Sequence, residues 1–559
     1  MLMEGSVRCS ANYVPLSPIS FLERAAIVYG DRVSIVYGDH VKFTWKETFE
    51  RCVRLASALV THLGISRGDV VAALAPNVPE LYELQFGVPM AGGVLCTLNP
   101  RFGSKTVSDL LEFANAKVIF VDYEFLDVAR EAIEILEKKT SNIPQIILIS
   151  ESDKSLSMNT IDPPCNHAIP EYKDLLESGS LEFEIKRPID ECDSIALTFT
   201  SGTTANSKGV VYSHRGAYLN SLATILIMEM PPMPVFLWSV PMFHCNGWCF
   251  PWAMAAQGGK NVCMRLASEK NIFESIARHH VTHMAGAPTI LNTIANASPT
   301  DIIPISRTPV KVMTGGAAPP PQVLLRMEEL GFKVYHCYGS TECYGPATVC
   351  TWKPEWDSLP PEAQASLRAR HGLKHVGMEE VDVKDPITMK SVPNDAKTIG
   401  EVMLRGNTVM GGYFKNAKAT ENVFKGGWYR SGDLGVKHPD GYIEVKDRST
   451  DVIVSSGQYI SSINIEVVLF SHPKVFEAAV VGVPDDHFGE VSCAFVKLKE
   501  GYDVDADEII DFCRIRLPEN MTPRMVVFED LPKTATGKTQ KVILREKAKI
   551  LYGQKSFFV

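Results

Sequence analysis

Short apolar runs alternate with amphipathic helical patterns along most of the chain, and this alternation limits the possible folds more than any other feature. Apolar runs of this kind are typical of strands buried on both faces. Strands that alternate with helices predict parallel sheets covered by helices, an α/β fold. Strands are expected at residues 69–74, 116–121, 145–149, 195–199, 209–213, 281–285, 310–314 and 332–336, and helices at residues 44–63 and 79–91.

Glycines follow two of these strands, Gly315-Gly316 after one and Tyr338-Gly339 after another. Loops are therefore expected at the carboxyl ends of the strands, where open α/β sheets bind their ligands.

The pattern changes after residue 395, where short β-type runs at 401–405, 441–446 and 451–455 replace the alternation. Strands at 475–481 and 491–497 and a helix at 505–516 follow, as is typical of a smaller α+β unit. We therefore predict two domains, residues 1–447 and residues 448–559.

The composition is that of a globular protein with room for at least two domains: 559 residues, 45% hydrophobic and 22% charged. The net charge of −9 argues against a nucleic-acid partner. Thirteen cysteines without Cys-x-x-Cys pairs favour reduced thiols. Neither an export signal nor a terminal Ser-Lys-Leu address is apparent, so a cytosolic protein is expected.

Residues 235–256 are apolar enough to suggest a membrane span. Pro241, His244 and Pro251 near their middle favour a buried pocket wall instead, so we expect no membrane span.

Three histidines, His279, His280 and His283, invite a zinc interpretation. No cysteine or carboxylate ligands stand nearby in a recognisable pattern, so a helix end that leads into a strand is favoured.

Residues 198–214 place several hydroxyl side chains, glycines and Lys208 between two β-type runs. Backbone amides near glycines, hydroxyl donors and a lysine suit a polyphosphate. The loop is not the P-loop of nucleoside triphosphatases, because Ser207 precedes Lys208 and Gly209 follows it. Taken alone, it predicts only polyphosphate binding.

Four further motifs follow in order: Tyr338-Gly-Ser-Thr-Glu342, Trp428-Tyr-Arg-Ser-Gly-Asp433, Asp447-Arg-Ser-Thr-Asp-Val-Ile453 and Leu531-Pro-Lys-Thr-Ala-Thr-Gly-Lys538. With the loop, they make residues 15–550 resemble the adenylate-forming superfamily of acyl-CoA synthetases, luciferases and peptide-synthetase adenylation domains. The string Pro241-Met-Phe-His-Cys-Asn-Gly-Trp248 is most similar to plant acyl-activating enzymes of the short-chain and benzoate/cinnamate clade.

The resemblance implies a large N-terminal domain with two stacked, mostly parallel sheets plus a distorted β-barrel, and a small mobile α+β C-terminal domain. It implies an AMP-forming acid–thiol ligase of fatty acid or plant secondary metabolism. ATP and a small carboxylic acid would give an acyl-adenylate and pyrophosphate, and coenzyme A would then displace AMP. ATP, Mg²⁺ and coenzyme A are the implied cofactors, and a monomer or weak homo-oligomer is expected.

The resemblance also implies roles for matched residues. Residues Thr200–Lys208, the phosphate loop, would hold the β- and γ-phosphates. Asp433 and Arg448 would hold the ribose, and Lys538 would bridge the acid and the α-phosphate. The implied catalytic residues are Lys538, His244, Thr341 and Glu342, with Glu342 as the Mg²⁺ ligand. The implied ATP- and coenzyme A-binding residues are Thr200, Ser201, Gly202, Thr203, Thr204, Lys208, Gly316, Ala317, Ala318, His336, Cys337, Tyr338, Gly339, Ser340, Thr341, Asp433, Arg448, Ser456, Gly457 and Lys538.

The acyl pocket is expected beside His244, which would border the acid and the access route of coenzyme A. A nearby Trp248 would shorten the pocket, and no charged partner for an acyl tail is apparent. Uncharged short, medium-chain or branched aliphatic acids are therefore expected, with benzoate or cinnamate as the alternative. A non-CoA acceptor and a catalytically silent scaffold are further alternatives, and the intact Lys538, Glu342 and Asp433 argue against the scaffold.

The implied hinge between the half-reactions falls at Thr450, where many relatives carry Asp or Lys, with Asp451 beside it. Ser456 and Gly457 would face the pantetheine tunnel.

The phosphate loop departs from the superfamily pattern at two positions. Ala205 stands where relatives have Gly or Ser, and Ser207 where they have Pro. Loss of the fixed φ of proline predicts a freer loop tip and weaker ATP binding.

Overall fold

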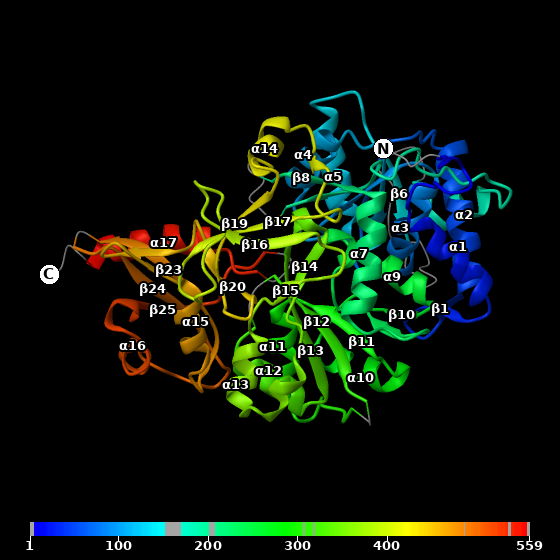
Figure 1. Ribbon diagram of the computed structural model, residues 1–559. Helices are drawn as coiled ribbons and strands as arrows, with labels where there is room; N and C mark the ends of the chain where they lie inside the picture. Colours follow the sequence, from blue (N-terminus) through cyan, green and yellow to red (C-terminus); the bar gives the residue numbers. More distant parts are fainter. Residues whose placement is uncertain are drawn as a thin grey trace.

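The computed structural model describes residues 5–150, 169–200, 207–305, 308–316, 319–485, 487–534 and 538–555. Figure 1 shows a large body of layered sheets and helices, with a smaller unit, orange to red, at one side.

A seven-stranded sheet forms the first large layer. Its spatial order is β18 (Gly412–Tyr413), β8 (Gly209–Ser213), β7 (Ser194–Phe199), β4 (Val94–Leu98), β3 (Val70–Leu74), β5 (Val118–Asp122) and β6 (Gln145–Ile149). Neighbours run parallel from β7 to β6, whereas β8 and β18 are antiparallel. Strands β3, β4 and β5 are buried along their whole length, as their continuous apolar runs predict.

A nine-stranded sheet forms the second large layer. Its spatial order is β15 (Leu373–Lys374), β14 (Gly345–Val349), β13 (Phe332–Ser340), β12 (Val310–Thr314), β11 (His283–Gly286), β9 (Val235–Leu237), β10 (Lys260–Cys263), β1 (Val33–Tyr37) and β2 (Val41–Thr44). Neighbours from β13 to β1 are parallel, and the strands beyond them are antiparallel.

Helices fill the space between the sheets and cover their outer faces. The inner helices α1 (Ile19–Val28), α2 (Trp45–Thr61), α3 (Pro79–Met90), α7 (His214–Ile227) and α9 (Phe250–Gln257) share one core with strands of both sheets. Helices α4 (Ser104–Ala114) and α5 (Leu126–Glu137) cover the seven-stranded sheet, and α10 (Glu269–His279), α11 (Pro288–Ala295) and α12 (Pro321–Glu329) cover the nine-stranded one. Nearly every residue of α3 is buried because this helix lies in the middle layer.

An antiparallel sheet completes the large part. Its strands are β16 (Glu380–Lys384), β17 (Gly400–Arg405), β19 (Tyr429–Lys437) and β20 (Ile443–Arg448). A bridge between Gly372 and Ile443 joins it to the segment that precedes β15. Helices α6 (Tyr172–Ser178), α13 (Pro361–Arg368) and α14 (Ala417–Val423) complete the large part.

The smaller unit has its own sheet and its own apolar cores. The sheet runs β22 (Gln458–Ile460), β21 (Ile453–Ser455), β24 (Gly489–Leu498), β23 (Val475–Asp485), and β25 (Met525–Phe528) pairs with β24. Helices α15 (Ser462–Phe470), α16 (Ala506–Arg514) and α17 (Lys541–Lys555) accompany it.

This architecture confirms the predicted α/β class, with a large N-terminal part and a smaller α+β C-terminal part. One expected loop is wrong: β13 continues to Ser340, so Tyr338 and Gly339 lie inside a strand. The strand continues because β14 turns back and pairs with its second half.

The apolar segment at residues 235–256 lies in the interior, as predicted, and forms β9, α8 (Cys245–Trp248) and α9. Among the described residues, no helix has both the length and the apolarity needed to cross a bilayer. The three histidines stand where α10 ends at His279 and β11 begins at His283.

A buried ion pair joins the two large sheets. Asp122 ends β5 and is fully buried, and the Arg265 guanidinium, just beyond β10, donates to both of its carboxylate oxygens at 3.0 and 2.9 Å. Arg265 also donates to the Tyr37 hydroxyl at the end of β1. This arginine therefore satisfies a carboxylate that water does not reach.

Replacing Arg265 with methionine should lower the free energy of unfolding by about 3 to 5 kcal/mol, because Asp122 would stay buried without its cation. The midpoint of urea unfolding measures the change. The matched control Arg278→Met removes an exposed partner of Asp39 and should cost less than about 1 kcal/mol. Equal losses in the two variants would contradict this account.

Candidate functional site

Hydrogen bonds close the phosphate loop at its base, between β7 and β8. The Thr200 amide donates to the Lys208 carbonyl at 3.0 Å, and the Lys208 amide donates to Thr200 Oγ1 at 3.0 Å. The Ser207 hydroxyl donates to the Thr200 carbonyl at 2.7 Å. The predicted phosphate contacts of Ser201, Gly202, Thr203 and Thr204, and the freer tip at Ala205, lie outside the described residues.

Tyr413 joins the lysine of this loop to the motif that follows β13. The Lys208 ammonium lies 4.6 Å from the centroid of the Tyr413 ring, and the Tyr413 hydroxyl donates to Glu342 Oε1 at 2.8 Å. Tyr413 reaches this place because β18 pairs with β8, which sets Tyr413 opposite Val210. Tyr413 was not predicted from the sequence, because no local pattern indicates that β18 pairs with β8.

Backbone contacts position Thr341 and Glu342, which form a short 3₁₀ turn directly after β13. The Tyr212 hydroxyl donates to the Thr341 carbonyl at 2.7 Å, and the Met410 amide donates to the Glu342 carbonyl at 2.7 Å. Both contacts come from segments next to the phosphate loop. The loop and the Thr341-Glu342 turn are therefore parts of one site.

The residues present fit Mg²⁺ only as an ion shared with a nucleotide. In the described part of the chain, no group of three His, Cys, Asp or Glu side chains could hold a metal alone. The Tyr413 hydroxyl donates its hydrogen bond to Oε1 of the Glu342 carboxylate. One carboxylate combined with phosphate oxygens is a usual coordination of Mg²⁺ in nucleotide sites.

Asp433 on β19 is the centre of a second cluster. The Tyr338 hydroxyl donates to its Oδ2 at 2.7 Å, and Arg448 Nε lies 3.5 Å from its Oδ1. Asp433 and Arg448 face each other in the register of β19 and β20. Burial raises the pKa of Asp433, and Arg448, Tyr338 and Lys538 oppose that rise.

The charges of this second cluster act on Lys538, which lies in the smaller unit. Burial and the positive charge of Arg448 lower the pKa of Lys538 to about 8, although Asp433 acts in the opposite direction. The Lys538 amide donates to Thr534 Oγ1 at 3.0 Å, and the Thr534 amide donates to the Lys538 carbonyl at 2.6 Å. These two bonds hold the backbone of the segment that carries Lys538.

Two of the glycines predicted to bind the nucleotide lie in contrasting surroundings. A Cβ added at Gly339 would lie 1.9 Å from the Gly345 carbonyl oxygen, so only glycine allows β13 and β14 to approach this closely. Gly316 has a φ of +93°, and an added Cβ would meet no atom within 4 Å. Ala317 and Ala318, predicted to flank adenine, lie outside the described residues.

His336, Cys337 and Tyr338 are consecutive buried residues of β13. His336 Nδ1 lies 3.0 Å from the Arg370 carbonyl oxygen, and its ring packs on His371. Burial lowers the pKa of His336 to about 4, so the ring is neutral at pH 7. Cys337 is also buried, and the Ser340 hydroxyl lies 3.4 Å from that of Tyr429.

A left-handed turn follows His244. Residues 245–249 all have positive φ values, between 41° and 64°. Four of the five carry side chains, for which this conformation costs about 1–2 kcal/mol each. Asn246 holds the turn, because its Nδ2 donates to Gln85 Oε1 at 2.8 Å and its Oδ1 accepts from Thr198 Oγ1 at 3.2 Å.

This turn connects His244 and Trp248, the two residues predicted to border the acyl pocket. Burial lowers the pKa of His244 to about 4, so it presents a neutral imidazole. Trp248 is buried, and its Cα and Cβ lie 3.5 Å from the position of a Cβ at Gly345. Neither of these two residues therefore carries a charge.

Ser456 and Gly457 lie apart from both clusters. They form the exposed tip of the hairpin between β21 and β22, where the Ser456 amide donates to the Phe488 carbonyl at 2.7 Å. No recorded contact among the described residues joins either of them to the phosphate loop or to Asp433.

Family models match the chain in two places. One, described as AMP-binding enzyme, matches residues 22–414, and the other, AMP-binding enzyme C-terminal domain, matches residues 464–538.

Plant relatives match nearly the whole chain. A probable acyl-activating enzyme 21 of Arabidopsis thaliana is 54% identical over 98% of each chain. An acetate–CoA ligase of Humulus lupulus is 50% identical over 97% of this chain and 96% of its own. The fold is shared with a solved anthranilate CoA ligase in complex with anthranoyl-AMP, at a TM-score of 0.81, 23% identity and coverage of 98% and 100%.

The expectation of a cytosolic protein is wrong. Several relatives have peroxisomal in their names, among them an acetate/butyrate–CoA ligase and a benzoate–CoA ligase of Arabidopsis thaliana and a trans-cinnamate:CoA ligase of Petunia hybrida. A cellular address is read by a receptor, and composition and fold do not reveal it.

The two family matches and the relatives agree with the motifs and with the layered fold. The chain belongs to the AMP-binding enzyme family and, within it, to the AMP-forming acid–CoA ligases.

Proposed function

We propose that this ligase activates a small carboxylic acid at the site between Lys208, Glu342, Asp433 and Lys538. A carboxylate oxygen attacks the α-phosphorus of ATP, the bond to the β-phosphate oxygen breaks, and pyrophosphate leaves. The coenzyme A thiol, after losing its proton, attacks the acyl carbon, and AMP leaves. The observation that carries this proposal is the geometry of two clusters, Lys208 with Tyr413 and Glu342, and Tyr338 with Asp433 and Arg448. The charges of the second cluster act on Lys538 from a different structural unit.

Each cluster supplies one part of the chemistry. Lys208 and the phosphate loop hold the β- and γ-phosphates, and Asp433 accepts hydrogen bonds from the ribose hydroxyls. Lys538 stands between two anions, the acid and the α-phosphate, whose mutual repulsion would otherwise keep them apart. Mg²⁺ bound to Glu342 and the phosphates would neutralise charge on the leaving pyrophosphate.

The acid is proposed to be an uncharged aliphatic one, short, medium-chain or branched. A neutral His244 and the buried Trp248 support this, because neither offers a partner to a second carboxylate. Relatives named acetate–CoA ligase and 2-methylpropanoate–CoA ligase support the same class. Relatives named for cinnamate and benzoate keep an aromatic acid as the second candidate.

Residues 448–559 are proposed to turn as one unit about Thr450 between the two half-reactions. The exposed position of Ser456 and Gly457 supports this, since a pantetheine-binding role requires them to move toward the site. A peroxisomal location is proposed from the relatives with that name.

Replacing Lys538 with alanine should reduce acid-dependent ATP–pyrophosphate exchange by about 100- to 1,000-fold, the usual cost of one missing electrostatic partner. Thioester formation from supplied acyl-adenylate should change only a few-fold, because the acid and the phosphate are already joined. The control Lys549→Ala alters an exposed lysine of α17 and should change neither rate. A large loss in the second half-reaction alone would contradict the assigned role.

The pH dependence of the exchange should report the ammonium of Lys538. This group is cationic below its pKa of about 8 and loses its charge above it, so kcat/KM should fall as pH rises through about 8. Arginine stays protonated, so Lys538→Arg should lower the rate and remove this descending limb. Persistence of the limb in that variant would assign it to another group.

A panel of acids tests the pocket. Acetate, butyrate and 2-methylpropanoate should support thioester formation with higher kcat/KM than succinate or a C16 fatty acid, because a second carboxylate finds no partner and Trp248 blocks a long chain. Trp248→Ala should shift the preference by about 10-fold or more toward longer or aromatic acids. Activity restricted to dicarboxylates would reject this pocket.

A further inference from the structure

We propose that Lys541 and Arg545 are positioning residues for Lys538. They tie the start of α17 to the segment at residues 447–451 and so hold the lysine in place for acid activation. This inference rests on the proposed function and adds residues to which no catalytic role has been assigned above.

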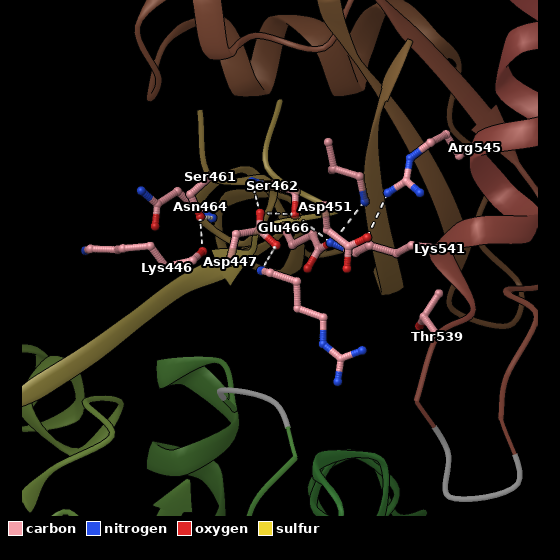
Figure 2. A network of polar contacts seen from close by, with 12 residues as sticks. Lys446, Asp447, Asp451, Ser461, Ser462, Asn464, Glu466, Thr539, Lys541 and Arg545 are labelled. Carbon is pink, nitrogen blue, oxygen red and sulfur yellow. Dashed lines mark hydrogen bonds and ion pairs between the residues drawn. The ribbon is translucent and has the colours of Figure 1, made fainter. Parts of the chain in front are cut away.

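The helix geometry puts both cations on one face. α17 begins at Lys541, three residues after Lys538, and Arg545 follows four residues later. Residues four apart on a helix share a face. Figure 2 shows Lys541 and Arg545 reaching from α17 toward Asp451 and Glu466.

Lys541 is the first anchor. Its ammonium lies 2.7 Å from Glu466 Oε1 on α15, with side chains 14% and 16% exposed, so water screens the pair little. The same ammonium donates to the Ser462 hydroxyl at 2.6 Å. Glu466 also accepts from the Val480 amide at 2.8 Å, which fixes the carboxylate on the sheet of the smaller unit.

A relay continues from Lys541 to the ribose pair. The Ser462 hydroxyl and amide both donate to Asp447 Oδ2, at 2.6 and 2.8 Å. Asp447 lies on β20 directly before Arg448, the partner of Asp433. One unbroken set of contacts therefore connects the base of the Lys538 segment to the strand that carries Arg448.

Arg545 is the second anchor, and it holds the boundary itself. Its guanidinium donates to the Thr450 carbonyl at 2.9 Å and to Asp451 Oδ1 at 2.7 Å. The direction of the Thr450 carbonyl depends on the backbone torsion of Thr450, which is the proposed hinge. Rotation about this residue must therefore break or redirect the contact with Arg545.

Together the anchors make α17 a rigid link between the hinge and the catalytic lysine. Losing either cation leaves a poorly hydrated carboxylate without its partner and frees one end of the link. A displacement of about 1 Å at a reacting centre can cost about 100-fold in rate. The loss of rate should therefore appear in acid activation, the half-reaction that uses Lys538.

The test compares four variants: Lys541→Met, Lys541→Arg, Ser462→Ala and the control Lys549→Met. Lys541→Met should lose about 10- to 100-fold in acid-dependent ATP–pyrophosphate exchange, and less than about 3-fold in thioester formation from supplied acyl-adenylate. Lys541→Arg should recover most of the exchange. Ser462→Ala keeps the ion pair with Glu466 but breaks the relay to Asp447, so it should show a smaller loss of the same kind even if Lys541→Met does not fold.

A second measurement needs no activity. Hydrogen exchange of the Thr534 and Lys538 amides, which bond within the Lys538 segment, should be faster in Lys541→Met and Ser462→Ala than in the wild type, and unchanged in Lys549→Met. Unchanged hydrogen exchange of these amides in Lys541→Met and Ser462→Ala would overturn the inference. So would an equal loss of rate in both half-reactions at an unaltered melting temperature. Absence of adenylation by the wild type would reject the proposed function, whereas the amide measurement would still decide whether these residues hold Lys538.

Discussion

The site depends on one largely buried carboxylate, Asp433. Its two oxygens lie against Tyr338 from β13 and Arg448 from β20, and the charge of Lys538 in the smaller unit favours its ionised form. A buried carboxylate without such partners would be unfavourable. The antiparallel sheet, the nine-stranded sheet and the smaller unit must therefore pack in positions that bring these groups to Asp433. Satisfying Asp433 and assembling the nucleotide site are therefore the same structural requirement.

The charges of the same cluster help to set the pKa of Lys538. Burial and Arg448 both disfavour the charged form of Lys538, whose pKa falls to about 8, while Asp433 favours it. A lysine in this state is a cation that has already lost much of its water, so the approach of two anions needs less further desolvation. Tyr413 links the two groups on the phosphate side, because its ring contacts Lys208 and its hydroxyl donates to Glu342.

The sequence predicted the parts whose signal is local. Mainly apolar runs indicated β3, β5, β6 and β12 to within about two residues, because strands of a sheet covered by helices are mostly apolar. The motifs around Asp433, Glu342 and Lys538 were recognised by resemblance, and the structure places Tyr338, Asp433 and Arg448 in contact.

Other features depend on long-range contacts that no local pattern encodes. Tyr413 enters the site only because β18 pairs with β8, and the extension of β13 to Ser340 depends on its pairing with β14. The left-handed turn at 245–249 was also missed, since only Gly247 and Asn246 are residue types that favour such φ values. The link through Lys541 and Arg545 depends on how α17 packs against the boundary segment (Figure 2).

The central claim is that the acid attacks the α-phosphorus of ATP beside Lys538. Oxygen-18 in the carboxylate of butyrate tests this directly, by mass spectrometry of AMP, pyrophosphate and the thioester after complete turnover. The account predicts one labelled oxygen in AMP and none in pyrophosphate. Label in pyrophosphate, or an unlabelled AMP in the presence of labelled thioester, would contradict it.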